Sequence, residues 1–384
     1  MFNILTLNKI SKIGLSVLDA EKYNCADNIT DPDAILVRSA SMHEMKLSDK
    51  TLAVARAGAG VNNIPLGDYA DSGVVVFNTP GANANAVKEL VICALLLSSR
   101  KVAASIEWAK SLKGEGENVP KLVEKGKSQF AGPEIAHKTL GVVGMGAIGA
   151  LVAESAKALG MSIIGFDPFL SEARNKEFRD KGFKITADIE DIWSSCDYIS
   201  LHLPLNDGTR GIVNAESIGK MKDGARIINM ARGELVDSDD ILAALDKGKI
   251  AAYVTDFPNE AQISHPGVTA IPHLGASTPE SEDNCAVMAA TEVSHYLENG
   301  SIIHSVNYPD LELPEDFTIR TCFLHDENEK FADKVTKAAK TGGAKIENIY
   351  SASKKGKGYT VIDTDKIFDA SDIKAIRVRL LKNN

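Results

Sequence analysis

The sequence predicts an α/β protein with two doubly wound parallel-sheet domains and a small C-terminal α+β module. Short apolar runs alternate with polar or helical segments over most of the 384 residues, a pattern typical of parallel sheets. A glycine-rich turn joins an apolar run to a helical pattern near the middle of the chain, and the last segment follows the order βαββαβ. A chain of this length also exceeds what one core usually supports.

The first domain is predicted from four apolar strands, and a domain boundary is expected near the long apolar helix Ala86–Arg100 that follows them. The predicted strands are Phe2–Leu7, Ala34–Val37, Ala53–Ala57 and Val74–Phe77. Their alternation with polar segments predicts one parallel sheet. A mixed polar and charged segment, Lys113–Lys138, then leads into the second domain.

The second domain begins with a strand, a glycine turn and a helix. The run Leu140–Val143 is β-like, Leu151–Leu159 has helical spacing, and Met161–Phe166 reads as a second buried strand. Further strands are predicted at Tyr198–Leu201, Ala225–Asn229 and Ala251–Thr255, with Val268–Ala270 as a candidate. This series predicts a second doubly wound, Rossmann-like sheet.

A long helix at Glu282–Asn299 is expected to cross back to the first domain, before an acidic linker flanked by Pro309 and Pro314. The last module is predicted to be ferredoxin-like. Its strands are Thr318–Leu324, Lys345–Tyr350, Tyr359–Asp363 and Arg377–Leu381, its helices Lys330–Lys340 and Ala370–Ile376, and its hairpin tip Lys354–Lys357. The predicted domains are residues 1–94 with 281–312, residues 95–280, and residues 317–384.

Composition excludes several classes of function. The net charge of −9 argues against a general nucleic-acid binder. The five cysteines are scattered and never form a CxxC pair, which indicates a reducing compartment and no zinc or other metal site. The start of the chain is too polar for a signal peptide, and the longest apolar stretch, Val91–Leu97, is too short to span a membrane. We therefore expect a cytoplasmic protein without a membrane partner.

The glycine turn predicts a dinucleotide site. Gly144 would let the chain turn off the strand, Gly146 would admit a pyrophosphate, and Gly149 would allow close packing of helix on strand. Asp167 lies about 20 residues beyond, where an acid that accepts hydrogen bonds from ribose hydroxyls is expected. No nearby arginine replaces it, so NAD is favoured over NADP. The alternative is an ordinary βαβ unit whose glycines serve steric purposes alone.

Three later segments supply polar residues at the carboxyl ends of predicted strands, where ligands bind in such sheets. Arg232 could clamp a substrate carboxylate with paired hydrogen bonds. His273 could take the proton of a secondary alcohol while hydride leaves the same carbon. Glu260 could bond the far nitrogen of His273, fixing its tautomer and stabilising its imidazolium form. Taken singly, they read as a surface ion-pair partner, a turn residue and a solvated loop residue.

The chain resembles the D-isomer-specific 2-hydroxyacid dehydrogenases over nearly its whole length. Within that family it is most similar to the phosphoglycerate branch. The resemblance rests on Arg38–Ala40, Arg56–Asn63, Asn78–Gly81, Gly144–Gly149, Leu201–Pro204, Ala231–Gly233 and Pro272–Thr278. It implies that Arg232, Glu260 and His273 form the catalytic trio and that Asp256 lies beside the nicotinamide carboxamide. The cofactor-binding residues expected on this basis are Gly144, Gly146, Ala147, Ile148, Gly149, Asp167, His202, Pro204, Ala231, Asp256, His273 and Gly275.

The phosphoglycerate branch implies a phosphorylated 2-hydroxy acid as substrate, oxidised in the first step of serine biosynthesis. Arg38 is the first candidate for its phosphate, and the backbone amides of Ala59, Gly60 and Val61 are candidates for its carboxylate. The further substrate-binding candidates are Asn78, Arg56, Lys88 and Arg232. Lys88 has an equally good interpretation as a structural charge pair with Glu89 or another neighbour.

The resemblance also implies a homodimer or homotetramer and a C-terminal module like the ACT regulatory domains. Glu329–Lys330 replaces the Pro-Gly that normally shapes the ACT ligand loop, and Lys345 replaces an asparagine. We therefore expect a structural or dimerising role rather than serine feedback.

Two alternatives to the leading function stay open. One is a hydroxypyruvate or glyoxylate reductase, or another D-2-hydroxyacid dehydrogenase, which would need no phosphate site. The other is an NADH-sensing interaction protein of the corepressor kind, against which the intact Arg, Glu and His set argues.

Overall fold

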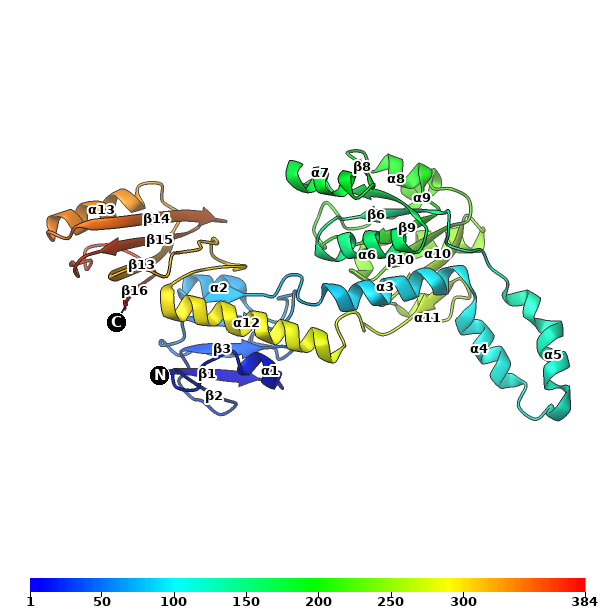
Figure 1. Cartoon of the computed structure of the whole chain (residues 1–384), viewed down its shortest axis with the longest axis horizontal. Coiled ribbons are helices and arrows are strands. Elements are labelled where there is room, and N and C mark those ends of the chain that lie inside the picture. The colour runs from blue at the N-terminus through cyan, green and yellow to red at the C-terminus, as the bar shows by residue number, and fades with distance from the viewer. Residues whose placement is uncertain (384) are drawn as a thin grey trace. The chain divides into compact units, whose positions relative to one another are not determined.

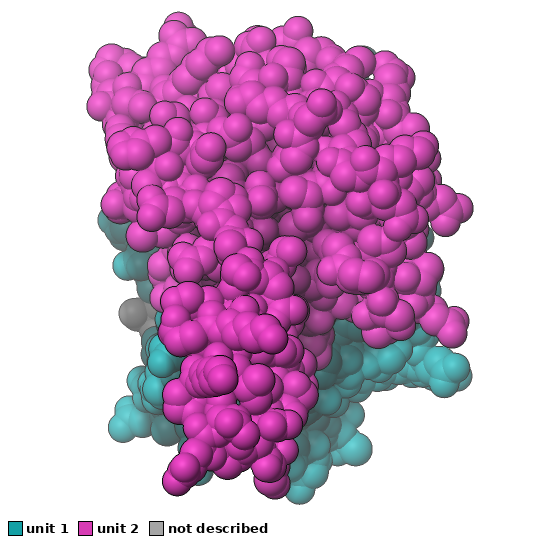
Figure 2. Space-filling view, turned by 90° about the vertical axis from the view of Figure 1, so that its right-hand side faces the viewer, with its two compact units in different colours: residues 1–83, 279–384 teal, residues 84–278 magenta. Residues whose placement is uncertain are grey.

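The computed structural model describes residues 1–383, which form two compact units (Figure 2). The first unit comprises Met1–Asn83 and Pro279–Asn384, and the second comprises Ala84–Thr278. Both central sheets are parallel, and a smaller antiparallel sheet follows near the C-terminus. This confirms the predicted fold class. In the described part of the chain, no helix has the length and apolar character needed to cross a bilayer.

The sheet of the first unit has, among residues 1–383, five parallel strands in the order β2-β1-β3-β4-β5. This is the flavodoxin-like strand order. Figure 1 labels β1, β2 and β3 of this sheet. Its strands are β1 (Phe2–Leu7), β2 (Tyr23–Ala26), β3 (Ala34–Val37), β4 (Ala53–Arg56) and β5 (Val75–Phe77), and its helices are α1 (Lys12–Leu15), α2 (Leu66–Asp71) and α12 (Pro279–Asn299). Helix α12 packs its alanine-rich face on the sheet, so the predicted return of the chain to this unit is confirmed.

The second unit contains, within the described residues, seven parallel strands in the order β12-β11-β10-β9-β6-β7-β8. The direction of strand order reverses between β6 and β9, so this is the Rossmann switch point. The strands are β6 (Thr139–Val143), β7 (Ser162–Phe166), β8 (Lys184–Thr186), β9 (Tyr198–Leu201), β10 (Ala225–Asn229), β11 (Ile250–Thr255) and β12 (Val268–Ala270). The helices are α3 (Ala84–Ser99), α4 (Val102–Ser111), η1 (Gly116–Asn118), α5 (Val119–Gly126), η2 (Lys127–Phe130), α6 (Ala147–Ala158), α7 (Glu172–Asp180), α8 (Glu190–Ser195), α9 (Ala215–Lys220), η3 (Gly233–Leu235), α10 (Ser238–Asp246) and α11 (Glu260–Ile263).

Several of these helices begin at polar side chains that the sequence supplies. Ser171, Asn214 and Asp237 each accept a backbone N–H from the first turn of the helix that follows, which satisfies donors that a helix start leaves unpaired. The segment Lys113–Lys138, predicted only as mixed polar sequence, instead contains helix α5. None of the residues of α4, η1, α5 and η2, all of them described, is buried, so none of these helices contributes a buried side chain to a core.

The C-terminal module has, as far as the structure describes it, four antiparallel strands in the order β14-β15-β13-β16. Its elements are β13 (Ile319–Asp326), α13 (Phe331–Thr341), β14 (Ile346–Lys354), β15 (Lys357–Thr364) and β16 (Arg377–Lys382). The predicted hairpin tip is confirmed, with Lys355 and Gly356 at positive φ. The predicted helix Ala370–Ile376 is wrong, because the segment is a turn in which the Asp369 carboxylate accepts the N–H of Ser371.

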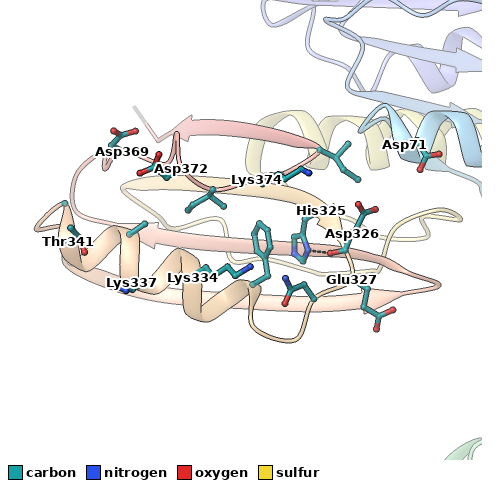
Figure 3. A pocket seen from close by; sticks show the side chains of 17 residues that line it. Asp71, His325, Asp326, Glu327, Lys334, Lys337, Thr341, Asp369, Asp372 and Lys374 are labelled. Atoms are coloured by element: carbon teal, nitrogen blue, oxygen red, sulfur yellow. Dashed lines mark hydrogen bonds between the residues drawn. The ribbon is translucent and has the colours of Figure 1, made fainter.

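A groove of about 1100 Å³ lies between α13 and this turn segment. Figure 3 shows Lys334 and Lys337 on the helix side and Asp369, Asp372 and Lys374 on the other. The groove therefore has side chains of both charges.

One face of the C-terminal sheet packs into the core of the first sheet, and the other face packs against α13 in a separate buried cluster. The sequence predicted this module as a separate domain. Cys322, Leu324, Tyr359 and Val361 belong to the same buried cluster as Phe77 and Tyr296. Two arginines add polar attachments at the C-terminal end of α12. Arg320 donates to the carbonyl of Asn299 (2.8 Å), and Arg379 donates to those of Tyr296 and Leu297 (both 3.0 Å). These bonds satisfy carbonyl groups that a helix end leaves unpaired.

Arg320 is itself held by a buried ion pair. Its Nε and Nη2 atoms donate to the two Asp363 oxygens at 2.7 and 2.9 Å, and the side chains are 0% and 1% exposed. Phe317 covers the guanidinium, 4.1 Å from the ring centre. The module is therefore attached to α12 through a charge that water does not reach.

We expect Asp363→Asn to lower the free energy of unfolding by about 3–5 kcal/mol, because the buried guanidinium would lose its countercharge. Urea unfolding followed by fluorescence measures the change. Asp180→Asn is the control, since its ion pair with Lys176 is exposed and such pairs contribute about 1 kcal/mol or less. Equal losses in both variants would contradict the role given to Asp363.

Candidate active site

The glycine turn between β6 and α6 leaves no room for side chains at two of its three glycines. Gly144 has φ +96°, and a Cβ there would lie 2.5 Å from the carbonyl oxygen of His202. A Cβ on Gly149 would lie 2.0 Å from the carbonyl oxygen of Gly144. Neither position accepts a side chain, so both glycines are required by the turn itself.

Gly146 is different, because the space beside it is open. It is the N-cap of α6 and offers no side-chain cap to the first turn, which holds Ala147 and Ile148. A Cβ on Gly146 would meet no described atom within 4 Å. Unpaired N–H groups at a helix start, next to open space, fit a pyrophosphate group.

Asp167 follows β7 and lies beside the same turn. Its two oxygens accept the N–H groups of Met145 and Phe169, each at 3.0 Å. A carboxylate oxygen has more than one acceptor site, so the side chain can hold the turn and still accept ribose hydroxyls. These groups together fit a dinucleotide of the NAD type.

His202 and Pro204 follow β9, and the His202 carbonyl lies against the glycine turn. The Nε2 atom of His202 is 2.9 Å from the Ser200 hydroxyl, and burial lowers the pKa of His202 to about 4. The imidazole is therefore neutral at physiological pH and adds no charge beside the phosphate position.

Arg232 and His273, which follow β10 and β12, contact one aromatic ring. The Phe257 ring centre lies 4.3 Å from that of His273 and 5.7 Å from the Arg232 guanidinium carbon. Asn229 fixes the intervening backbone by donating to the Arg232 carbonyl at 2.8 Å and accepting the N–H of Ala231 at 3.2 Å. The predicted carboxylate clamp and proton acceptor are thus brought together. Phe257 was not among the predicted site residues, because its contact with both side chains is set by the tertiary structure.

Glu260 is the first residue of α11 and is exposed. Asn259 caps that short helix by accepting the N–H of Gln262 at 3.1 Å. The start of α11 therefore sets where the Glu260 side chain leaves the backbone, three positions after Phe257. Its action on His273 stays a prediction.

Asp256 is 2% exposed, and neither of its carboxylate oxygens has a hydrogen-bond partner among residues 1–383. Burial raises its pKa to about 6. The backbone N–H groups of Asp256 itself and of Gly275 are close enough to offset part of that rise, although neither forms a hydrogen bond of normal geometry with the carboxylate. A Cβ on Gly275 would stand 3.7 Å from Asp256 Oδ2. A buried acceptor without a donor fits the amide group of a nicotinamide ring.

The substrate-binding candidates of the first unit follow β3, β4 and β5. Arg38 is paired with Glu282 at 2.8 Å, and Arg56 donates from Nε to the Arg38 carbonyl at 3.0 Å. Asn78 donates to the Ala59 carbonyl at 2.6 Å. In the described residues, no backbone carbonyl accepts the N–H groups of Ala59, Gly60 and Val61. These amides are therefore suited to a carboxylate.

Lys88 lies on α3 in the second unit and is 18% exposed. Its ammonium is 3.6 Å from the Glu89 carboxylate, which also accepts a hydrogen bond from Asn85 at 3.0 Å. The alternative of a charge pair with Glu89 is confirmed as a contact, and a substrate role stays a prediction.

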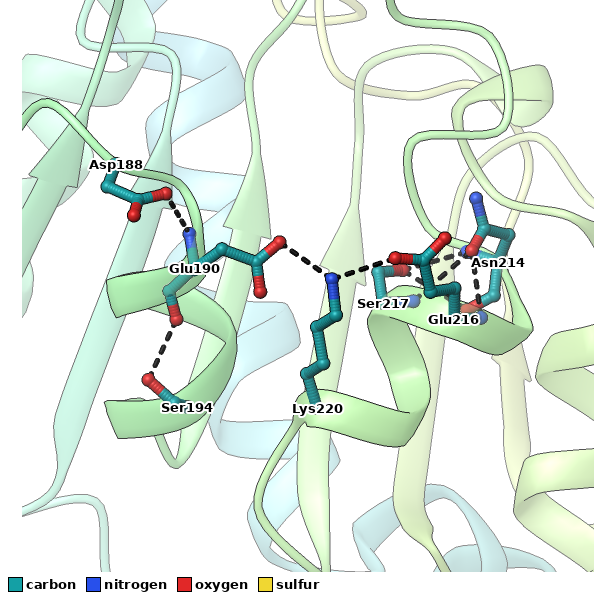
Figure 4. A network of polar contacts seen from close by, with 7 residues as sticks. All are labelled: Asp188, Glu190, Ser194, Asn214, Glu216, Ser217 and Lys220. Carbon is teal, nitrogen blue, oxygen red and sulfur yellow. Dashed lines mark hydrogen bonds and ion pairs between the residues drawn. The ribbon is translucent and has the colours of Figure 1, made fainter.

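A separate polar network joins α8 and α9 (Figure 4). Lys220 bonds both Glu190 and Glu216 at 2.9 Å, while Asn214 and Ser217 form a capping box. None of the predicted site residues belongs to this network, so we assign it to the packing of these helices.

Comparison with known proteins agrees with this geometry. Residues 93–275 match the family described as "D-isomer specific 2-hydroxyacid dehydrogenase, NAD binding domain". The D-3-phosphoglycerate dehydrogenase of Bacillus subtilis is 32% identical over 333 residues, 82% of this chain and 61% of that protein. The chain spans 54% to 61% of the length of the first curated relatives.

Two solved structures share the fold. The NAD+-bound 3-phosphoglycerate dehydrogenase of Entamoeba histolytica aligns with a TM-score of 0.62 at 26% identity, over 81% of this chain and 99% of that one. A glyoxylate reductase from Paecilomyes thermophila aligns with a TM-score of 0.65 at 25% identity, over 79% of this chain and 98% of that one.

We expect Gly146→Ala to weaken NADH binding about tenfold or more without lowering the melting temperature, because the methyl group would enter only the open space. Quenching of intrinsic fluorescence by NADH measures the affinity. Gly219→Ala is the control, since its added Cβ also meets no described atom within 4 Å. Unchanged NADH affinity in Gly146→Ala would contradict the phosphate assignment.

Asp256 should make stability depend on pH. Its folded pKa of about 6 exceeds an unfolded value of about 3.9, so the folded state binds more protons and stability falls as pH rises between these values. Asp256→Asn should therefore raise the free energy of unfolding at pH 8 by about 2–3 kcal/mol at most, with the gain vanishing near pH 4. Urea unfolding at both pH values tests this against Asp207→Asn, an exposed control. Equal stability of wild type and Asp256→Asn at pH 8 would refute it.

Proposed function

We propose that this chain is a member of the D-isomer specific 2-hydroxyacid dehydrogenase family, whose NAD-binding domain its residues 93–275 match, and that it oxidises D-3-phosphoglycerate to 3-phosphohydroxypyruvate with NAD. This reaction opens the phosphorylated route to serine. The observation that carries the proposal is the contact of Arg232 and His273 with the same Phe257 ring. A cation that binds a carboxylate and a base that takes a proton are the two groups that oxidation of a 2-hydroxy acid requires.

Each residue has a defined task in the proposed reaction. Arg232 binds the substrate carboxylate through its planar guanidinium and polarises the developing carbonyl group. His273 accepts the hydroxyl proton, and in the reverse direction it returns that proton. Glu260 holds the imidazole in the required tautomer. NAD, when bound, supplies the acceptor for the hydride that leaves the substrate carbon.

Recognition of the phosphate is proposed for Arg38, with Arg56 close by and the amides of Ala59, Gly60 and Val61 available to the carboxylate end. Asn78 supports this loop through the Ala59 carbonyl. Lys88 is a further basic candidate. The curated relatives named as D-3-phosphoglycerate dehydrogenases support the phosphorylated substrate.

One observation favours a second candidate, an unphosphorylated substrate such as hydroxypyruvate or glyoxylate. Arg38 already carries a carboxylate partner in Glu282, and a reductase for these acids needs no phosphate site. The similarity to a glyoxylate reductase agrees with this candidate. Self-association as a homodimer or homotetramer belongs to the same family-based proposal, and analytical ultracentrifugation measures it.

The first experiment follows NADH absorbance with 3-phosphohydroxypyruvate, hydroxypyruvate, glyoxylate and 2-ketoglutarate. A strong preference for 3-phosphohydroxypyruvate supports the proposal, whereas comparable rates with the unphosphorylated acids favour the second candidate. Tight NADH binding without turnover of any of these acids would favour an NADH-sensing interaction protein.

We expect His273→Ala to lower kcat at least about 10²-fold, because the general base would be lost. NADH binding should persist, since the glycine turn remains intact. His295→Ala is the control, as that histidine is exposed on α12. Near-normal turnover of His273→Ala would remove His273 from the mechanism.

A further inference from the structure

The backbone around Arg38 is held from two neighbouring segments. The residue follows β3, and the next two N–H groups, of Ser39 and Ala40, donate to Asn8 Oδ1 at 3.1 and 2.7 Å. Its carbonyl accepts a hydrogen bond from Arg56. The backbone of Arg38 is therefore fixed, and the orientation of its guanidinium depends on the group that it binds.

The guanidinium binds Glu282, whose helix is also fixed in place. Glu282 lies in the first turn of α12, where a helix start favours a negative charge. The next residue, Asp283, accepts a hydrogen bond from the Ser11 hydroxyl before α1. One turn later Ala286 packs on Gly14 so closely that a Cβ on Gly14 would lie 2.3 Å from the Ala286 Cβ. The carboxylate is thus presented to Arg38 by a clamped helix start.

We propose that Glu282 is a specificity-determining residue, whose carboxylate competes with the substrate phosphate for Arg38. This inference rests on the proposed function, because it assumes that Arg38 receives the phosphate. The Arg38 Nη2 to Glu282 Oε1 distance of 2.8 Å is that of a charge-assisted hydrogen bond. A phosphate that binds the same guanidinium must displace the carboxylate or lie beside it.

The charge of the substrate decides whether Glu282 changes its affinity for the site. A phosphate monoester carries about 1.5 to 2 negative charges at pH 7, so a neighbouring carboxylate repels it. An unphosphorylated 2-hydroxy acid has no such group and meets no such repulsion. The Arg38 and Glu282 side chains are 37% and 42% exposed, and such pairs are exchanged at little cost. Glu282 therefore reduces, without abolishing, the preference for a phosphorylated substrate.

The test compares KM for 3-phosphohydroxypyruvate with KM for hydroxypyruvate. Glu282→Gln should lower the first by about two- to fivefold, the range that an exposed ion pair supplies, and leave the second unchanged. Glu280→Gln is the matched control, because Glu280 shares the first turn of α12 and the same charge. In an Arg38→Gln background the effect of Glu282→Gln should disappear. Calorimetric titration with 3-phosphoglycerate compares the Kd of the same variants without turnover.

The outcomes separate the two proposals. Arg38→Gln could weaken binding of the phosphorylated ligand while Glu282→Gln leaves that binding unchanged or weakens it too. This result would refute competition by Glu282 and leave the phosphate site in place. Equal improvement for both substrates also refutes it. If Arg38→Gln leaves the phosphorylated ligand unaffected, the phosphate site itself is wrong.

Discussion

The candidate site depends on the parallel register of the second sheet. Six of its strands are paired so that their last residues form one continuous row of partners. The row runs Phe166, Val143, Leu201, Asn229, Thr255 and Ala270. Asp167, Gly144, His202 and Asp256 each follow a member of this row directly, so their place at one edge is set by backbone pairing. A slip by one residue in any strand would turn its site residue to the other face.

Much of this arrangement could be predicted from the sequence because it depends on local patterns. The spacing of Gly144, Gly146 and Gly149 predicted a turn off the strand, a pyrophosphate approach and close packing of helix on strand. Gly144 has the positive φ of such a turn, the space beside Gly146 is open, and a Cβ on Gly149 would meet the Gly144 carbonyl. Arg232 and His273 could be assigned to one edge because apolar strands precede both. What no local pattern showed was Phe257, whose ring joins them across two different loops.

The features that escaped prediction arise from tertiary packing. Cys322 and Tyr359 pack into the buried cluster that contains the parallel sheet of the first unit. The apolar pattern of a strand shows that one of its faces is buried, but it does not show which part of the protein buries that face. The turn in place of helix Ala370–Ile376 reflects the competition of Asp369 for a backbone N–H. The partner of Arg38 was equally hidden, since Glu282 lies far along the chain.

Arginine–carboxylate pairs at the two ends of α12 show how burial decides the role of the same chemical contact. Arg320 and Asp363 are almost fully buried, so loss of either charge would leave the other buried with neither a countercharge nor water to solvate it. The pair therefore acts as a permanent attachment. Arg38 and Glu282 are exposed to water, which can replace either partner, so this pair can be exchanged for a ligand. The first pair therefore belongs to the architecture, and only the second can take part in choosing a substrate.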